Sequence, residues 1–182
     1  MNINKLLSTE ERVKILKDIL YKENMLRVSE VSNRLGLSKG LVSKFFDILT
    51  EEGILKKEGM KFRILENKDL IALKILLNLN SFDLRIFKMF EFIKGAGFYG
   101  SFVKGLNTEE SDTDLYVLIE DTSDENLAKI TRKLKEKDRR INPLYLTEEK
   151  IKVLKEEDKV FYYSLIFGSI NIYGKEIEEL RI

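Results

Sequence analysis

The sequence predicts an α+β fold in two parts, and three features of its 182 residues support this. Residues 8–66 show apolar positions at helical spacing, followed by two short apolar segments around Glu58-Gly59. From about residue 84 onward, apolar runs typical of strands alternate with amphipathic stretches typical of helices. The whole chain contains a single proline, so few positions break these patterns. We therefore expect domains at 1–66 and 84–182, joined by a connecting helix at 67–83.

The composition narrows the possible chemistry. The chain has no cysteine, which excludes disulfides, thiol catalysis and cysteine-ligated metal sites, and it has no histidine, the usual general base. No apolar run approaches the roughly 18 residues needed to cross a bilayer. The first residues, MNINKLLSTEERV, lack the apolar core of a signal peptide. We expect a cytoplasmic protein with no membrane partner.

The first part begins with a capped amphipathic helix and continues with two helices that share one core. Ser8-Thr9-Glu10-Glu11 provides the cap, and Val13 to Leu20 provide the apolar face. Val31 and Leu35 precede a turn at Gly36-Leu37-Ser38. The second helix then buries Leu41, Val42, Phe45 and Leu49, which is helix-turn-helix spacing. The segments 54–57 and 60–65 predict two strands of a hairpin.

Residues 8–66 resemble the winged helix-turn-helix domains of archaeal and bacterial transcription regulators. The resemblance implies duplex DNA as a partner, because cations and hydroxyl donors on a slim element can contact phosphates in a groove. Residues 1–66 carry 13 basic and 10 acidic side chains, which supports this only modestly. An alternative is a protein-docking or dimerisation module. The residues expected to approach DNA are Ser38, Lys39, Ser43 and Lys44 of the second helix and Lys56, Lys57, Lys61 and Arg63 of the hairpin, or wing.

Two strongly apolar helices are predicted between the domains, at 70–77 and 84–93. The break between them ends at Asp83, a residue type that caps a following helix. The first of these helices carries more apolar surface than a lone linker helix should expose. It is therefore interpreted as a dimer seam or an interdomain brace, and we expect a homodimer.

The most informative motif lies in the second part. Gly100-Ser101 is followed, after ten residues, by Asp112-Thr113-Asp114 at the head of an apolar run. Two carboxylates one residue apart on a strand point to the same face and can share a metal ion. A Gly-Ser turn offers N–H groups and a hydroxyl to phosphate oxygens, and Lys104 adds positive charge. The pattern indicates a site for a magnesium-bound nucleotide; the alternative is an ordinary polar turn before a core strand.

The stretch GSFVKGLNTEESDTDLYVLI resembles the motif of the minimal nucleotidyltransferases of the DNA polymerase beta superfamily. The resemblance extends over nearly all of residues 84–178, with strands at 115–119, 141–146 and within 169–177. Helices are expected at 124–137, 148–154 and 159–167. It implies a small mixed sheet flanked by helices, with Mg²⁺ held by Asp112 and Asp114. It also implies that a nucleoside triphosphate is contacted by Gly100, Ser101, Lys104 and Ser111.

One position departs from that family. Members that transfer a nucleotide carry a third acid on a later strand, and here the corresponding residue is Asn142. An amide cannot act as a general base and binds Mg²⁺ more weakly than a carboxylate does. Asp138 is close in the sequence, but it precedes the strand and is expected to face solvent.

Two functions from different classes remain open. In the first, the protein is a DNA-binding transcription regulator whose second domain binds a magnesium-nucleotide, as a sensor or a weak transferase. In the second, it is an active nucleotidyltransferase that uses Asp112 and Asp114 to move a nucleoside monophosphate onto a hydroxyl. The acceptor would be a protein, an RNA or a small molecule, and a toxin-antitoxin pair is one form of this alternative.

Overall fold

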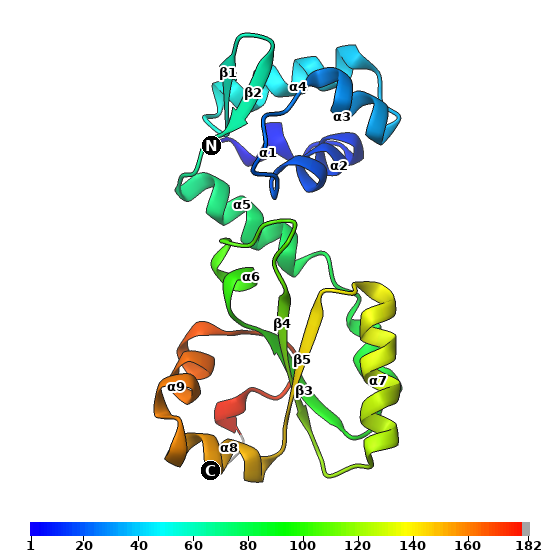
Figure 1. The fold of residues 1–182 in the computed structure, drawn as a ribbon, viewed down its shortest axis with the longest axis vertical. Coiled ribbons are helices and arrows are strands. Elements are labelled where there is room, and N and C mark those ends of the chain that lie inside the picture. Colours follow the sequence, from blue (N-terminus) through cyan, green and yellow to red (C-terminus); the bar gives the residue numbers. More distant parts are fainter. Residues whose placement is uncertain (180–182) are drawn as a thin grey trace. The chain divides into compact units, whose positions relative to one another are not determined.

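A computed structural model describes residues 1–179 and divides into two compact units between Leu77 and Asn78 (Figure 1). The division falls inside one helix, α5 (Lys68–Leu79), which lies in the segment expected to connect the domains. None of the helices in residues 1–179 combines the length and apolar character needed to span a membrane.

The first unit contains the predicted helix-turn-helix. Its elements are α1 (Ile3–Leu6), α2 (Glu10–Ile19), α3 (Val28–Leu35), α4 (Lys39–Glu51), β1 (Leu55–Glu58), β2 (Lys61–Ile64) and most of α5. The Thr9 side chain caps α2, and the Ser38 side chain caps α4. Gly36 ends α3 in the left-handed conformation, with φ of 66°, which a residue with a side chain adopts at a cost. The turn between α3 and α4 is therefore encoded locally.

The predicted hairpin is also confirmed, and α5 completes the core of the same unit. Strands β1 and β2 pair antiparallel from Leu55↔Ile64 to Glu58↔Lys61. Leu70, Leu73 and Leu77 of α5 are buried in the cluster that holds the apolar faces of α2, α3 and α4. A large part of the apolar surface noted in the sequence of α5 is thus covered within its own unit.

The second unit is built on a four-stranded mixed sheet. Its elements are η1, a 3₁₀ helix (Leu84–Met89), β3 (Ile93–Phe98), α6 (Ser101–Lys104), β4 (Thr113–Ile119), α7 (Asp124–Lys137), β5 (Ile141–Leu146), α8 (Glu148–Glu157), α9 (Lys159–Gly168), β6 (Ile170–Gly174) and η2 (Ile177–Glu179). The strand order is β5-β4-β3-β6, and only the β4–β5 pair is parallel. The mixed sheet and the helices expected after residue 115 are therefore confirmed.

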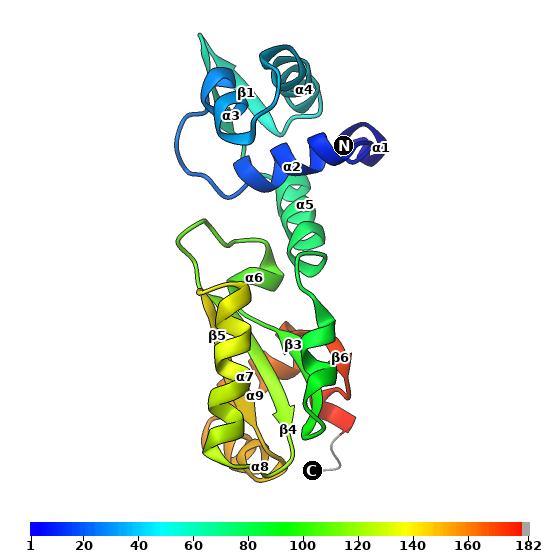
Figure 2. The same ribbon diagram turned by 90° about the vertical axis from the view of Figure 1, so that its right-hand side faces the viewer.

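Helices cover both faces of this sheet, with α7 on one face and α8 and α9 on the other (Figures 1 and 2). The side chains of β4 alternate between two cores accordingly. Leu115 and Val117 belong to the cluster that includes Ile130 of α7. Tyr116 belongs to the cluster that includes Leu165 of α9. By the same alternation, Asp114 projects from the face covered by α8 and α9.

The predicted helix at 84–93 is wrong in its second half. Asp83 caps the segment as expected, by accepting a hydrogen bond from the Arg85 N–H group. The helical turns end at Met89, however, and Ile93 begins β3 opposite Ile119. Ile93, the last residue of this apolar run, instead belongs to β3, an inner strand of the sheet. Periodicity alone cannot distinguish a buried helix from a buried strand over so few residues.

Candidate functional site

Two carboxylates lie at the start of β4. Asp112 is exposed and immediately precedes the strand, whereas Asp114 is its second residue and is half-buried. Residues separated by one position in an extended chain project to the same side, here the side of α8 and α9. Asp114 thus belongs to the strand itself and not to the preceding turn.

Asn142 lies directly beside Asp114. The parallel pairing of β4 with β5 places these two residues opposite each other. Burial raises the pKa of Asp114, the hydrogen bond from the Asn142 side chain opposes this, and the charge of Asp112 raises the pKa further. Among residues 1–179, no group of three or more acidic side chains could hold a metal ion. The amide thus stands at the register position where a third carboxylate would complete such a group.

The Gly-Ser turn packs against the carboxylate of Asp114. Gly100 has a φ of 72°, and a Cβ atom placed on it would clash with Oδ2 of Asp114. The backbone N–H of Tyr99 donates to the carbonyl of Asp114 at 3.1 Å. Burial, and then the charge of Asp114, raise the pKa of the Tyr99 phenol. Glycine at position 100 is therefore required both by its backbone conformation and by the space that Asp114 occupies.

We expect Gly100→Ala to destabilise the second unit by about 1–3 kcal/mol, since backbone strain and a steric clash combine. Gly36→Ala is the matched control, because Gly36 has a φ of 66° with no atom within 4 Å of the added Cβ. Denaturant unfolding measures both changes. Combining Gly100→Ala with Asp114→Ala should recover the part of the lost unfolding free energy that is due to the clash. Equal effects of the two glycine substitutions, with no recovery, would contradict the close approach of Gly100 and Asp114.

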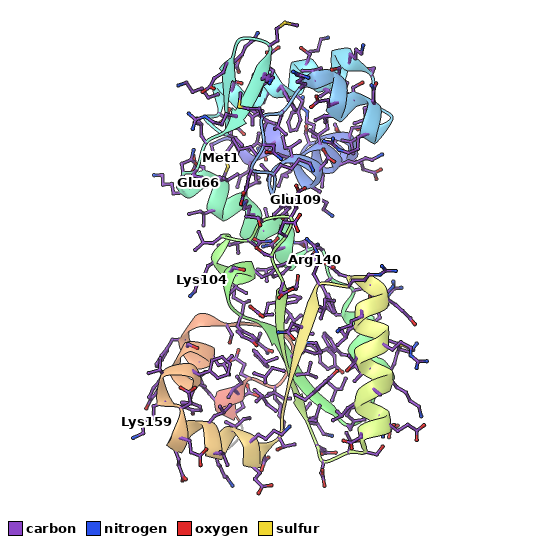
Figure 3. The ribbon with its side chains drawn as sticks, viewed as in Figure 1. Met1, Glu66, Lys104, Glu109, Arg140 and Lys159 are labelled. Atoms are coloured by element: carbon purple, nitrogen blue, oxygen red, sulfur yellow. The ribbon has the colours of Figure 1, made fainter. Side chains whose placement is uncertain are left out.

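The residues expected to contact phosphate differ in their positions and in the contacts they make. Ser101 begins α6 and is half-buried, and Lys104 is exposed in the same short helix (Figure 3). The hydroxyl of Ser111 instead accepts a hydrogen bond from the Thr108 N–H at 2.9 Å. Ser111 thus closes a turn in the loop between α6 and β4, while Gly100, which precedes Ser101, packs against Asp114.

Two buried asparagines support this loop and were not singled out by the sequence. The side-chain amide of Asn78 donates to the carbonyl of Phe102 at 2.6 Å and to Oδ1 of Asn107 at 2.9 Å. Both asparagines are almost fully buried. They therefore anchor α6 and the start of the loop. One feature of the sequence could have indicated them: Asn78 is a polar residue at the end of an otherwise apolar helical run.

Helix α4 and its cap contain four of the residues predicted to contact DNA, and these residues differ in exposure and in their contacts. It buries Val42, Phe45, Phe46 and Leu49, and this places Lys39 and Lys44 in solvent. Ser43 is half-buried. The Ser38 hydroxyl accepts a hydrogen bond from the Leu41 N–H at 3.2 Å. Ser38 therefore has a capping role in the structure, and its hydroxyl can contact a phosphate only as a donor.

The hairpin presents its cations on two faces. Lys56 lies opposite Arg63, and Glu58 lies opposite Lys61, so these four share one face. Nε of Arg63 is 3.2 Å and Nζ of Lys56 is 3.9 Å from Oε1 of Glu58, which reduces the positive charge there. Lys57 lies on the other face, with Nζ 5.9 Å from the ring centre of Phe62.

A groove of about 640 Å³ lies between the hairpin tip and the starts of α3 and α4. It brings together Lys39 and Lys61 with two residues that the sequence did not indicate, Arg27 and Ser29. Arg27 also pairs with Glu30 at 3.2 Å. Nothing in the sequence could indicate this groove, since it depends on how the hairpin packs beside the helices. Its lining residues are Arg27, Val28, Ser29, Lys39, Glu58, Met60 and Lys61.

Comparison with known families identifies both units. Residues 84–178 match the family described as polymerase beta, nucleotidyltransferase. Residues 9–57 match the bacterial regulatory protein, arsR family, which covers α2 to β1. No curated protein matches the chain. The chain belongs to the polymerase beta nucleotidyltransferase family and carries an arsR-type helix-turn-helix in front of that domain.

Proposed function

We propose that this protein is a DNA-binding transcription regulator whose second domain binds a magnesium-nucleotide. The observation that carries the nucleotide part is the contact of Gly100 with Asp114, beside Asn142 in the paired strand. The Gly-Ser turn and the two aspartates are retained, so phosphate and cation can be held. The amide at the third position makes binding without efficient transfer the favoured outcome.

The donor set fits a hard divalent cation. Asp112 and Asp114 supply carboxylate oxygens, and Asn142 can supply an amide oxygen if its side chain rotates away from its hydrogen bond. Mg²⁺ prefers such oxygens and completes its shell with phosphate oxygens and water. When bound, the cation would offset the negative charge of the triphosphate and of the two aspartates. In this arrangement the turn at Gly100-Ser101 contacts phosphate, and Lys104 adds positive charge.

The proposed site lacks a residue suited to accept the proton of the acceptor hydroxyl. The acceptor hydroxyl must lose a proton, and the Asn142 amide has no basic lone pair for it. The chain contains no histidine to take this role. Asp114 receives a hydrogen bond from Asn142 and faces Gly100, so its carboxylate is engaged in positioning. The nucleotide would therefore be released unconverted, so that its binding rather than its turnover acts as the signal.

DNA binding is assigned to α4 and the hairpin. The exposed Lys39 and Lys44 project from a helix whose opposite side is buried, which suits insertion into the major groove. The cations of the hairpin and of the adjacent groove would contact phosphates on either side. A homodimer would place two such helices on successive half-sites. Nucleotide binding would then change DNA affinity.

We expect the protein to bind duplex DNA with an affinity that falls steeply as salt rises. Replacing Lys56 and Lys57 by alanine should weaken binding to all sequences alike and reduce the slope of log K against log salt by about 2. Lys39→Ala or Ser43→Ala should instead change sequence preference. Fluorescence anisotropy with specific and random duplexes measures these effects.

The paired variant Lys135→Ala with Lys152→Ala is the matched control for loss of charge. Both lysines are exposed on the second unit, so the control should leave DNA affinity unchanged. No binding at low salt, or an affinity independent of salt, would remove the regulator proposal.

The second candidate is an active nucleotidyltransferase that modifies a hydroxyl of a protein, an RNA or a small molecule, including a toxin-antitoxin pair. The retained Asp112 and Asp114 favour it, because cations and positioning supply much of the rate in such displacements. The test is incubation of the protein with labelled ATP, CTP, GTP or UTP, Mg²⁺ and a cell lysate. Label fixed to protein or RNA would favour the transferase over the sensor.

A further inference from the structure

Arg140 lies between α7 and β5 and forms a two-point ion pair with Asp138. Its Nε and Nη2 atoms lie 3.0 Å and 2.8 Å from the two carboxylate oxygens of Asp138. The guanidinium holds the pKa of Asp138 below its usual range, so this carboxylate is ionised at neutral pH. The backbone N–H of Asp138 donates to the Leu134 carbonyl in α7. The guanidinium plane is thus fixed to the end of a helix.

The same residue makes two hydrogen bonds to the loop that carries Asp112. Its Nη1 atom donates to the carbonyl of Glu109 at 3.1 Å. Its own carbonyl accepts from the N–H of Thr113 at 2.9 Å. Figure 3 shows Arg140 at the start of β5 and Glu109 in the neighbouring loop. The side chain of Arg140 therefore holds the Glu109 end of the segment 109–113, and its backbone holds the Thr113 end, so substitution of the side chain releases only the first of these.

Asp112 needs such a constraint more than Asp114 does. Asp114 is held within β4 and packs against Gly100, whereas Asp112 is exposed and precedes the first residue of the strand. A metal ligand loses affinity when its backbone is free to move. Hydrogen bonds made directly to a ligand typically change metal affinity 10–100-fold, and Arg140 acts one step further out, on the residues at either side of Asp112. In the segment 109–113 of the proposed site, supporting hydrogen bonds come from Arg140, a residue outside the motif.

We infer that Arg140, held by Asp138, is a positioning residue that fixes Asp112 for the cation of the bound nucleotide. The inference rests on the proposed magnesium-nucleotide site. The planar guanidinium is essential to it, because one side chain must satisfy the Asp138 carboxylate and the Glu109 carbonyl at fixed angles. A lysine retains the charge but has a single ammonium group, so it cannot hold both partners in the same geometry.

Two measurements on the full chain test the inference. The first is amide hydrogen exchange of peptides covering residues 109–113 in the metal-free protein. The second is binding of Mn²⁺-ATP, measured as labelled ATP retained with the protein in equilibrium dialysis in the presence of Mn²⁺. The variants are Arg140→Ala, Arg140→Lys and, as a matched control, Arg139→Ala, which removes the adjacent exposed charge.

Both Arg140 variants should speed exchange in 109–113 about tenfold and weaken Mn²⁺-ATP binding about tenfold or more. The control should change neither, and the thermal midpoint of the metal-free protein should stay close to that of the natural chain in all three. Full retention of Mn²⁺-ATP affinity in Arg140→Lys would show that charge alone matters and would overturn the positioning role. Unchanged exchange in Arg140→Ala would also overturn it.

Failure of the site proposal gives a different result. If the natural chain does not bind Mn²⁺ with ATP, the magnesium-nucleotide proposal fails, and the positioning role falls with it whatever the exchange rates are. If the natural chain binds and the Arg140 variants bind equally well, the site proposal survives and the role of Arg140 alone is wrong.

Discussion

Asn142→Asp is expected to create or raise transfer of a nucleoside monophosphate by about 10²-fold or more, the usual scale for a general base. The strand register is the reason for choosing position 142, because this residue lies opposite Asp114 in a parallel pair and is exposed. A carboxylate there would stand beside Asp114, which is two residues from Asp112. Incorporation of label from α-phosphate-labelled nucleotides, with Mg²⁺ and a cell lysate, measures the gain.

Asn142→Ala is the matched control, since it removes the hydrogen bond to Asp114 without supplying a base. It should give no gain in transfer. Asn142→Asp should also make the metal-free protein less stable at neutral pH, because three carboxylates would then lie together without a cation. If the natural protein already labels a target and loses this activity in Asn142→Asp, the sensor proposal is wrong and the third catalytic group lies elsewhere.

Much of the fold was predictable because its signals are local. The turn at Gly36 and the strand that follows Asp112 are encoded by residue types within a few positions of each element. The family resemblance implied that Asn142 takes the place of a third acid on a later strand, whereas its position directly opposite Asp114 is set by the parallel register of β4 and β5. The helix predicted over 84–93 was wrong because the choice between helix and strand depended on pairing of Ile93 with Ile119, a contact distant in sequence.

The supporting contacts of the site could not be predicted in the same way. The hydrogen bond from Arg140 to Glu109 spans 31 residues, and that from Asn78 to Asn107 spans 29. Neither pair belongs to a periodic pattern. Ser111 shows the same limit on a smaller scale, since the motif gave no indication that its hydroxyl accepts a hydrogen bond from the N–H of Thr108. Side-chain hydrogen bonds depend on backbone geometry that a linear motif does not contain.

The paired substitution of Asp112→Asn with Asp114→Asn is expected to abolish Mg²⁺-dependent nucleotide binding while the fold is retained. Two carboxylates on one side of a strand repel each other, and burial adds to the cost of ionising Asp114. Amides of nearly the same shape remove both costs and also remove the anionic ligands for the cation. Affinity for ATP in the presence of Mg²⁺ should fall at least 100-fold, as measured by isothermal titration calorimetry.

The pH dependence of stability gives this experiment a second readout with a definite sign. The folded state raises the pKa of Asp114, so folding favours its protonated form, and the metal-free natural protein loses stability as pH rises through that raised pKa. At neutral pH the paired variant should therefore be the more stable protein without metal, by about 2–4 °C in midpoint for each kcal/mol relieved. The difference should disappear below the ordinary pKa of 3.8, where both states are protonated. Asp121→Asn, which alters an exposed acid of the same unit outside its helices and strands, should change neither readout. A paired variant that still binds ATP with Mg²⁺, or that unfolds more readily than the natural chain at neutral pH, would show that the two aspartates serve the fold rather than a cation.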